Sequence, residues 1–265
     1  MISSESVLKD LNQIRLQSPL VHNITNYVVM NNTANALLAI GASPVMAHAV
    51  DEVEDMVDIA SSLVINIGTL SKPWVDAMIR AGQEARRRQI PVVLDPVGAG
   101  ATAYRTETSL LILKECSPAV IRGNASEIMA LTGKKSNTKG VDSMDSSGSA
   151  VRIAKDIAQD TGAVIVVSGP VDYILDDKSV IQVRNGSPMM GKVTGLGCTA
   201  TALVGAFVAV NRNYLQAAAH AMAVMGIAGE LAAKISAGPG TMQMHFLDGL
   251  YRLSEKEISG HLNTE

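Results

Sequence analysis

The sequence has few aromatic residues, and its charges nearly balance. Phe, Trp and Tyr make up 3% of the 265 residues, too few to build the stacking platforms that hold nucleic-acid bases. The 22 Lys and Arg residues face 25 Asp and Glu residues, which gives a formal net charge of −3. This composition lacks the excess of Lys and Arg that binds a nucleic-acid backbone, and we expect a protein that binds no nucleic acid.

Cysteine is equally scarce. Cys116 and Cys198 are the two cysteines of the sequence, and no CxxC pair suggests a zinc site or a disulfide framework. The first fifteen residues lack the basic start and apolar run of a signal peptide and are typical of a capped helix. These features are typical of a protein from a reducing compartment, and we expect a cytoplasmic location.

Long hydrophobic runs are also missing. The most apolar stretches, Thr199–Val210 and Ala217–Ala233, are shorter than the roughly 20 residues that span a bilayer. The first ends at Asn211, and the second carries His220 and Glu230. We therefore expect no membrane contact. The Ala and Gly content of both stretches favours closely packed helices, either in the core or at a subunit interface.

What the sequence does contain is an alternation of short apolar runs with helical stretches. The predicted strands are Ser43–Ala47, Leu63–Ile67, Pro91–Leu94, Ala119–Ile121 and Val164–Val167. The predicted helices are one opened by an Asp51–Glu54 capping box and others near Lys72–Gln89, Thr106–Glu115, Ser126–Leu131 and Ser149–Gln159. Apolar strands separated by helices are typical of a parallel sheet with both faces covered.

The pattern changes after the last of these strands. Asp172–Leu175 and Val180–Arg184 flank a turn-rich joint and are predicted to form a hairpin, whereas everything from Gly195 onward has a helical pattern. The polar stretch Lys134–Gly148 is predicted to be a surface loop. Because no repeat and no interdomain linker is visible, we expect one domain over residues 1–265.

Polar and glycine residues follow each predicted strand. They are Met46 with His48, Gly68 with Thr69, the segment 95–100, the segment 122–124, and Ser168 with Gly169. Ligands of open α/β sheets bind at the carboxyl ends of the strands, where such residues gather. The set indicates an anion-binding crevice at that edge.

The most specific local signal is Thr194-Gly195-Leu196-Gly197-Cys198, directly before an apolar helix. Glycines allow a tight turn that presents successive N–H groups, and the helix N-terminus adds its positive dipole end. Together they suit a phosphate or the charge that develops while it is transferred. The spacing fits neither a dinucleotide fingerprint nor a Walker loop. Taken alone, the motif also fits a plain glycine-rich helix entry.

A second element, Arg122–Glu127, lies at a predicted strand end and helix start. Asn124 and Glu127 place an amide and a carboxylate within one turn, which suits a hydrated Mg²⁺ near phosphates, and Arg122 can pair with phosphate directly. Asp95 closes another strand and could supply a second carboxylate. The alternatives are a helix cap with a first-turn glutamate and an Asp-Pro turn.

The order of these elements resembles a known architecture. An N-x-x-E element in mid-chain followed by T-G-x-G-[D/C] at a helix start resembles the ribokinase-like fold of small-molecule kinases. The cysteine variant, together with VHNITNYVVMNNTANALLAIGASPVM at 21–46 and VVLDPVGAGAT at 92–102, resembles the hydroxyethylthiazole kinase family over nearly the whole chain.

The resemblance implies a fold, an activity and a set of residues. The fold would be a three-layer α/β sandwich with a mostly parallel sheet, forming homotrimers with active sites at subunit interfaces. The reaction would be phosphorylation of the hydroxyl of 4-methyl-5-(2-hydroxyethyl)thiazole by ATP with Mg²⁺. By matching motifs, the thiazole site would use Asn26, Met46, Gly68 and Gly195, and the nucleotide and metal side Asp95, Arg122, Glu127, Ser168 and Gly197. Asp95 and Glu127 would hold the metal, directly or through water.

Cys198 falls where related kinases carry a catalytic aspartate, and with Gly195 and Gly197 it would form the catalytic group. The thiol could act as a weak general base whose pKa is lowered by the helix N-terminus, or it could only occupy space. A covalent nucleophile is disfavoured because no histidine partner can be named. Two other functions remain open: a hydroxymethylpyrimidine or pyridoxal type of kinase, and a non-catalytic nucleotide sensor.

Overall fold

An eight-stranded sheet forms the centre of the molecule. The computed structural model describes residues 2–132 and 145–265. The strands follow the order β2-β1-β3-β4-β5-β6-β7-β8; β1 to β6 are parallel, and β7 and β8 are antiparallel additions at one end. Their bounds are β1 Leu20–Ile24, β2 Ser43–Val45, β3 Ser62–Asn66, β4 Val92–Asp95, β5 Val120–Asn124, β6 Val164–Ser168, β7 Asp172–Leu175 and β8 Val180–Val183.

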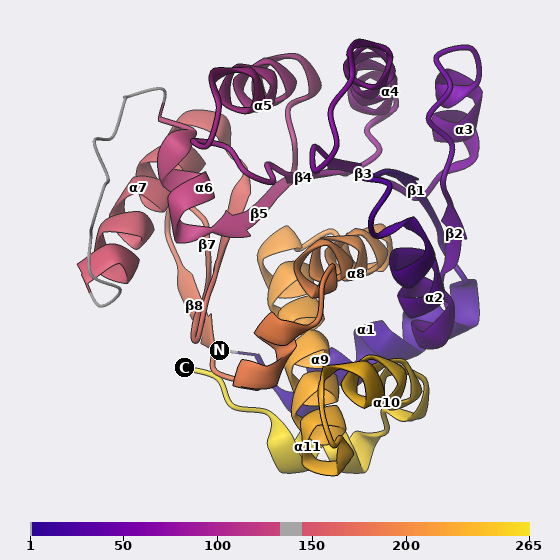
Figure 1. The fold of residues 1–265 in the computed structure, drawn as a ribbon, viewed down its shortest axis with the longest axis vertical. Coiled ribbons are helices and arrows are strands. Elements are labelled where there is room, and N and C mark those ends of the chain that lie inside the picture. The colour runs from indigo at the N-terminus through magenta and orange to yellow at the C-terminus, as the bar shows by residue number, and fades with distance from the viewer. Residues whose placement is uncertain (1, 133–144) are drawn as a thin grey trace.

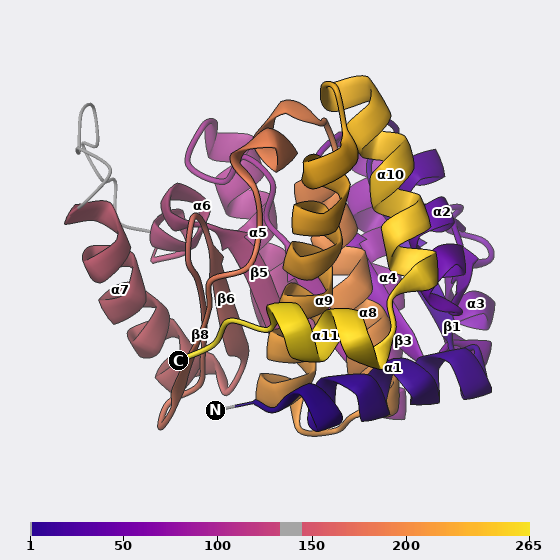
Figure 2. The same ribbon diagram turned by 90° about the horizontal axis from the view of Figure 1, so that it is seen from below.

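Helices cover both faces of this sheet (Figures 1 and 2). One layer contains α3 Val53–Ile59, α4 Lys72–Arg88, α5 Ala103–Cys116, α6 Ala125–Ala130 and α7 Asp145–Thr161. The other contains α1 Ser4–Gln17, α2 Met30–Ile40, α8 Leu196–Val210, α9 Tyr214–Ile235, α10 Pro239–Arg252 and α11 Glu255–His261, with the short 3₁₀-helix η1 Pro188–Lys192. The predicted three-layer α/β sandwich is confirmed.

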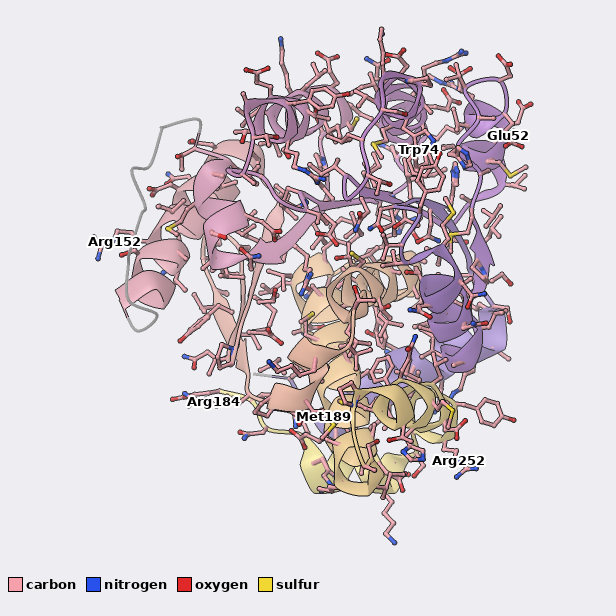
Figure 3. All side chains as sticks on the ribbon, viewed as in Figure 1. Glu52, Trp74, Arg152, Arg184, Met189 and Arg252 are labelled. Atoms are coloured by element: carbon pink, nitrogen blue, oxygen red, sulfur yellow. The ribbon has the colours of Figure 1, made fainter. Side chains whose placement is uncertain are left out.

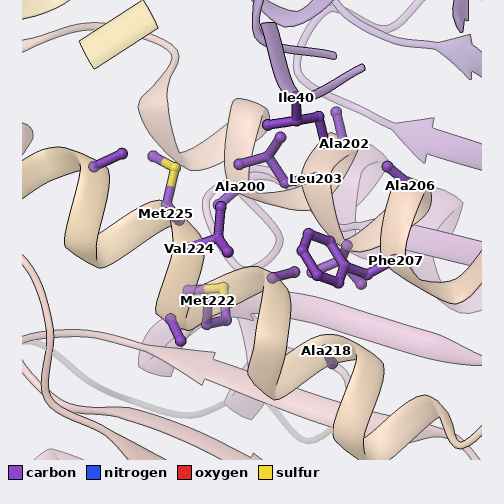
Figure 4. Close-up of a cluster of buried hydrophobic side chains, with 14 of the residues drawn as sticks. Ile40, Ala200, Ala202, Leu203, Ala206, Phe207, Ala218, Met222, Val224 and Met225 are labelled. Carbon is purple, nitrogen blue, oxygen red and sulfur yellow. The ribbon is translucent and has the colours of Figure 1, made fainter. Parts of the chain in front are cut away.

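Successive residues of the parallel strands point into the two cores in turn. In β3, Leu63 and Ile65 join the core under α3, α4 and α5, and Val64 between them joins the core around α8 and α9. This alternation follows from the two-residue period of a strand, and it explains why the buried strands read as continuous apolar runs. Phe207 and Met222 are among the side chains that fill the second core (Figure 4).

The apolar helices α8 and α9 lie inside the chain. The helix α9 has 22 residues and is long and apolar enough to cross a membrane by length and composition, so the expectation that its segment is too short was wrong. It packs against α8, α10 and the sheet, and 72% of its apolar window is buried there. Its polar residues have partners in the same chain: His220 Nδ1 lies 2.6 Å from Asp10 Oδ2.

The predicted strands and helices between residues 43 and 184 are confirmed with shifts of a few residues at their ends. The capping box at Asp51 is wrong, because α3 begins after Glu52 without a side-chain cap. Two elements of the N-terminal part, β1 and α2, were not predicted. Most of the predicted loop Lys134–Gly148 lies outside the described residues, and its last four positions belong to α7. The chain end is not helical: Gln182 and Glu265 exchange backbone hydrogen bonds beside β8.

Candidate active site

The carboxyl ends of β1, β3, β4, β5 and β6 meet the N-terminus of α8. In the register of the parallel sheet, Asn66 at the end of β3 lies beside Asp95 at the end of β4, and Asn124 of β5 lies beside Ser168 of β6. The helix α8 runs across the sheet from this edge and contacts β1, β3 and β4. Most of the polar residues singled out from the sequence are therefore gathered in one place.

Gly195 allows α8 to start where it does. It is the N-cap residue with φ +84°, a left-handed conformation that residues with a Cβ seldom adopt. A Cβ there would also lie 2.7 Å from Cγ1 of Val29. Thr199 N is the donor that closes the first turn onto Gly195 O, so the N–H groups of residues 196–198 have no intrahelical acceptor. The predicted cluster of N–H groups at a positive helix end is present.

Asn66 is the centre of a buried hydrogen-bond network. Its Oδ1 accepts from Asn26 Nδ2 at 2.8 Å and from Gly68 N at 2.9 Å, and its Nδ2 donates to Asp95 Oδ2 at 2.8 Å. Thr201 Oγ1 of α8 donates to the same Asp95 oxygen at 2.7 Å. The network joins the loops after β1 and β3 to the end of β4. All of its donor–acceptor distances are those of ordinary hydrogen bonds.

Close packing accompanies this network at Gly68. A Cβ at this position would lie 2.5 Å from Asn26 Nδ2, so only glycine lets the loop after β3 pass this close to the asparagine. The Asp95 carboxylate is 1% exposed, and its burial raises its pKa to about 6, against the opposing effects of Arg122 and Thr201. Asp95 is thus a buried acid–base group that Asn66 and Thr201 hold in place through hydrogen bonds.

Cys198 lies at the mouth of the same network. Asn26 Nδ2 donates to its Sγ at 3.4 Å, and the side chain is half-buried. Burial raises the pKa of the thiol, and the negative charge of Asp95 raises it further, against weaker opposing effects of Asn66, Asn26 and Arg122. The expectation that the helix N-terminus lowers this pKa was wrong. Desolvation and a neighbouring carboxylate hold the pKa above its ordinary value, so the group is a neutral thiol at pH 7.

Arg122 stands on the other side of the α8 N-terminus. Its guanidinium lies against Gly197, where a Cβ would come within 3.1 Å of Nη1. Within the described residues it makes no hydrogen bond and no ion pair, and its Nε is buried without a partner. A buried donor without an acceptor costs roughly 1–3 kcal/mol. An arginine in this condition suits an anion that arrives from outside.

The guanidinium borders a cavity of about 530 Å³, whose polar lining includes Ser168, Asp172 and Asn185 and whose apolar lining includes Met222 and Met225 of α9. Ser168 Oγ donates to Gly123 O at 3.2 Å, which ties β6 to β5 beside the cavity. Burial raises the pKa of Asp172 to about 6. The volume is in the range of small-molecule and cofactor sites.

Glu127 connects the loop after β4 to the end of β5. Its Oε2 accepts from Asn124 N at 2.8 Å while Asn124 Oδ1 accepts from Glu127 N at 3.0 Å, so the capping-box alternative is confirmed. Its Oε1 accepts from Gly98 N at 2.9 Å. The carboxylate is close enough to Asp95 to raise the pKa of that group. Glu127 therefore caps α6 and also fixes the glycine-rich loop after β4.

Three functional residues were not found from the sequence. Asn66 ends a buried strand, which is the signal that could have revealed it, whereas Thr201 lies in an Ala-rich helix without a distinguishing pattern. Arg105 of α5 donates to three carbonyl oxygens, those of Ile67, Val97 and Gly68, at 2.9, 2.6 and 2.8 Å. It thereby fixes the loops after β3 and β4 to each other.

Met46 is the predicted site residue that the structure leaves at the margin. It follows the edge strand β2 and is half-buried, and no hydrogen bond links it to the network. Two residues later, the His48 ring packs against Trp74 at a centroid distance of 4.5 Å and an interplanar angle of 41°. The Tyr27 ring lies 4.6 Å from the same side chain, centroid to centroid, and Figure 3 labels Trp74. These three rings form the one aromatic cluster found within the described residues, and Tyr27 follows Asn26 directly in the chain.

Comparison with known proteins decides the family. The model of the hydroxyethylthiazole kinase family matches residues 11–256. A hydroxyethylthiazole kinase of Syntrophus aciditrophicus is 57% identical over 262 residues, which is 98% of this chain and 97% of that protein. One of Leptospira biflexa is 54% identical over 261 residues, 98% of each chain. The chain belongs to the hydroxyethylthiazole kinase family.

Solved structures agree with this membership. The hydroxyethylthiazole kinase protein of Pyrococcus horikoshii OT3 superposes with a TM-score of 0.91 at 42% identity and covers 98% of each chain. The pyridoxal kinase of Staphylococcus aureus in complex with pyridoxal has a TM-score of 0.65 at 18% identity, covering 93% of this chain and 97% of that one. The second similarity shows the ribokinase-like fold and nothing about the substrate.

Proposed function

We propose that this member of the hydroxyethylthiazole kinase family phosphorylates the hydroxyl of 4-methyl-5-(2-hydroxyethyl)thiazole with ATP, as a step of thiamine salvage. The observation that carries the proposal is the position of the α8 N-terminus. The N–H groups of residues 196–198, which have no intrahelical acceptor, lie between the buried Asn26–Asn66–Asp95 network and the Arg122 guanidinium, which has no hydrogen-bond partner among the described residues. A phosphoryl group moving between two ligands needs positioning and charge neutralisation at such a point. We treat residues 1–265 as one kinase domain.

The acceptor alcohol would lie on the side of Asn26, Met46, Gly68 and Gly195. Asn26 and Gly68 are held rigid by Asn66, so their polar groups present a fixed shape to the ligand. Met46 offers a polarizable thioether, which packs favourably against an aromatic heterocycle such as thiazole. The assignment places a weakly polar ring against the part of the site whose own hydrogen bonds are already satisfied.

The nucleotide would lie on the side of Arg122, Ser168 and Gly197. Arg122 would take negative charge from the phosphates, which its unpartnered Nε supports. The cavity of about 530 Å³ beyond it would hold the nucleoside. The N–H groups of Gly197 and Cys198 would stabilise the equatorial oxygens of the phosphoryl group as charge develops on them.

The residues present could hold Mg²⁺ only if water and phosphate oxygens supplied most of its ligands. Within the described parts of the chain, no group of three or more His, Cys, Asp or Glu side chains could hold a metal ion. Asp95 and Glu127 are two carboxylates within electrostatic reach, and both already accept hydrogen bonds from the protein. This donor set suits a hydrated ion that keeps several waters and binds phosphate oxygens. When bound, the ion would neutralise phosphate charge.

Cys198 would act through its position. A neutral thiol is a poor proton acceptor, so the raised pKa favours the view in which the cysteine fills the space beside Asn26 while the surrounding N–H groups stabilise charge. The proton of the alcohol would then leave late and pass to an oxygen of the transferred phosphoryl group, once the new bond to phosphorus is largely formed.

The assembly and location are also proposed. The family resemblance supports a homotrimer with active sites at subunit interfaces, and the exposed Tyr27 and Val28 beside Asn26 agree with a partner subunit near the acceptor side. Two unpaired cysteines, Cys116 buried and Cys198 half-buried, support a location in the cytoplasm.

One panel of substrates tests the activity. The purified protein is incubated with ATP, Mg²⁺ and one of three alcohols: the thiazole alcohol, hydroxymethylpyrimidine or pyridoxal, and ADP formation is measured. We expect turnover with the thiazole alcohol alone. Turnover only with another alcohol would assign a different vitamin-precursor kinase, and tight nucleotide binding without any turnover would favour a sensor.

A further inference from the structure

The Asp95 carboxylate is held from two independent elements. Asn66 Nδ2 at the end of β3 and Thr201 Oγ1 in the second turn of α8 donate to the same oxygen, Oδ2, at 2.8 and 2.7 Å. Thr201 is 0% exposed, Asn66 is 1% exposed and Asp95 is 1% exposed. Neither donor faces solvent, so both side chains are committed to this contact.

The two donors belong to elements on either side of the proposed reaction. Through its Oδ1, Asn66 holds Asn26 Nδ2 and Gly68 N, which belong to the acceptor side of the proposed site. Thr201 lies three residues beyond Cys198 and one turn beyond Gly197, whose N–H groups belong to the phosphate side. Asp95 is therefore fixed relative to the acceptor loop by one bond and relative to the α8 N-terminus by the other.

We propose that Asn66 and Thr201 are positioning residues for phosphoryl transfer, which lock the Asp95 carboxylate between the acceptor loop and the N-terminus of α8. This inference rests on the proposed function. Neither side chain needs to touch a substrate for this role. A displaced carboxylate would misalign the reacting groups, and misplacements of about 1 Å are enough to slow catalysis about a hundredfold.

The neighbouring Thr199 offers a matched control. It lies on the same helix and is 1% exposed, and its Oγ1 is buried without a hydrogen-bond partner among the described residues. Thr→Val removes a hydroxyl while keeping the β-branched shape. At position 199 the substitution removes no bond, whereas at position 201 it removes a donor to a carboxylate. Thr201→Ser keeps the hydroxyl and loses a methyl group.

The test is steady-state kinetics on wild type, Thr201→Val, Thr201→Ser and Thr199→Val, with melting temperatures and with ADP affinity measured by calorimetry. We expect Thr201→Val to lower kcat between tenfold and a hundredfold while each KM and the ADP affinity change less than threefold. Thr201→Ser should recover kcat to within about threefold of wild type, and Thr199→Val should match wild type.

Each outcome decides the proposal. A kcat of Thr201→Val within threefold of wild type would overturn it, and so would an equal loss in Thr199→Val, because the effect would then belong to the helix in general. If Thr201→Val does not fold, Asn66→Ala removes the other donor and must lower kcat at least tenfold while the ADP affinity changes less than threefold; its KM for the alcohol is not used, because Asn66 also holds Asn26 and Gly68. Absence of turnover in the wild type would instead contradict the proposed activity, so the two failures are distinguishable.

Discussion

The two halves of the sheet edge differ in how far their polar groups are satisfied. On the β3–β4 side, Asn66 makes three hydrogen bonds and Arg105 donates to three carbonyl oxygens. On the β5–β6 side, Arg122 makes no hydrogen bond within the described residues, although its Nε is buried and a cavity lies in front of it. Two arginines at one edge thus have opposite surroundings.

The difference indicates which half is complete before ligands bind. A buried polar network in which every group has a hydrogen-bond partner is rigid, and its hydrogen bonds stabilise the folded protein before any ligand binds. An unpaired guanidinium is a standing cost of folding that a phosphate removes on binding. We infer that the β3–β4 side is preorganised for the acceptor and that the β5–β6 side is completed by the nucleotide.

The largest expected effect is the loss of Arg122. We expect Arg122→Met to lower kcat/KM for ATP roughly 10³-fold, because a positively charged group at the transferring phosphoryl is removed. The free energy of unfolding should change by less than about 1 kcal/mol, because Arg122 makes no hydrogen bond or ion pair among the described residues, and removing its unpaired buried donor offsets the lost attraction to Asp95 and Asp172. Steady-state kinetics and denaturant unfolding measure the two quantities. A stable variant with normal kinetics would exclude Arg122 from phosphate binding.

Asp172, which lines the cavity next to Arg122, should make stability depend on pH. Burial raises its folded-state pKa from 3.8 to about 6, so its stabilising contribution is full below pH 4 and is lost as the pH rises through 6. The difference corresponds to roughly 3 kcal/mol. Part of this difference has already developed at pH 4.5, so we expect Asp172→Asn to gain roughly 2 kcal/mol of stability relative to wild type between pH 4.5 and 7.5 in urea unfolding. An unchanged difference between the two proteins at both pH values would contradict the burial of this charge.

Arg105 should show the reverse of the Arg122 result. Arg105→Met leaves three carbonyl oxygens without their donor, and we expect a loss of roughly 2 kcal/mol in the free energy of unfolding. Because the guanidinium holds the loops after β3 and β4, KM for the alcohol should rise more than KM for ATP. Equal stabilities for Arg105→Met and Arg122→Met would remove the distinction between the two sides.

The smallest effect is expected at Cys198. A neutral thiol that accepts one weak bond from Asn26 is replaceable, so Cys198→Ser should keep kcat within about tenfold of wild type. Cys198→Asp, with the residue type of related kinases, should keep or raise turnover. Folded but inactive Ser and Asp variants would instead assign an essential thiolate to this position.

The fold could be predicted because its signals are local. Continuous apolar runs such as Leu63–Ile65 and Val164–Val167, separated by helical patterns, specify a buried parallel sheet. The strand β1 and the helix α2 were missed because His22, Asn23 and Asn31 interrupt the apolar pattern there. His22 and Asn23 are buried all the same: His22 Nε2 lies 2.8 Å from Ala47 O, and Asn23 Nδ2 donates to Val21 O at 2.8 Å.

The site could be predicted in outline and not in detail. Strand ends and the glycine motif located the edge, because the carboxyl ends of parallel strands come together. The contacts of Asn66 and Thr201 with Asp95 join residues 29 and 106 positions apart in the chain, which no local pattern reveals. The direction of the pKa shift of Cys198 was predicted wrongly for the same reason, because the burial of the thiol and its proximity to Asp95 depend on the tertiary structure.

Separate ligand affinities test the division of the site most directly. Calorimetry with ADP and with the thiazole alcohol is done on wild type, Arg122→Met and Gly68→Ala, in which a Cβ would lie 2.5 Å from Asn26 Nδ2. We predict that Arg122→Met loses ADP affinity and keeps alcohol affinity, and that Gly68→Ala does the opposite. Loss of the same ligand in both variants would contradict an acceptor side and a nucleotide side divided by the N-terminus of α8.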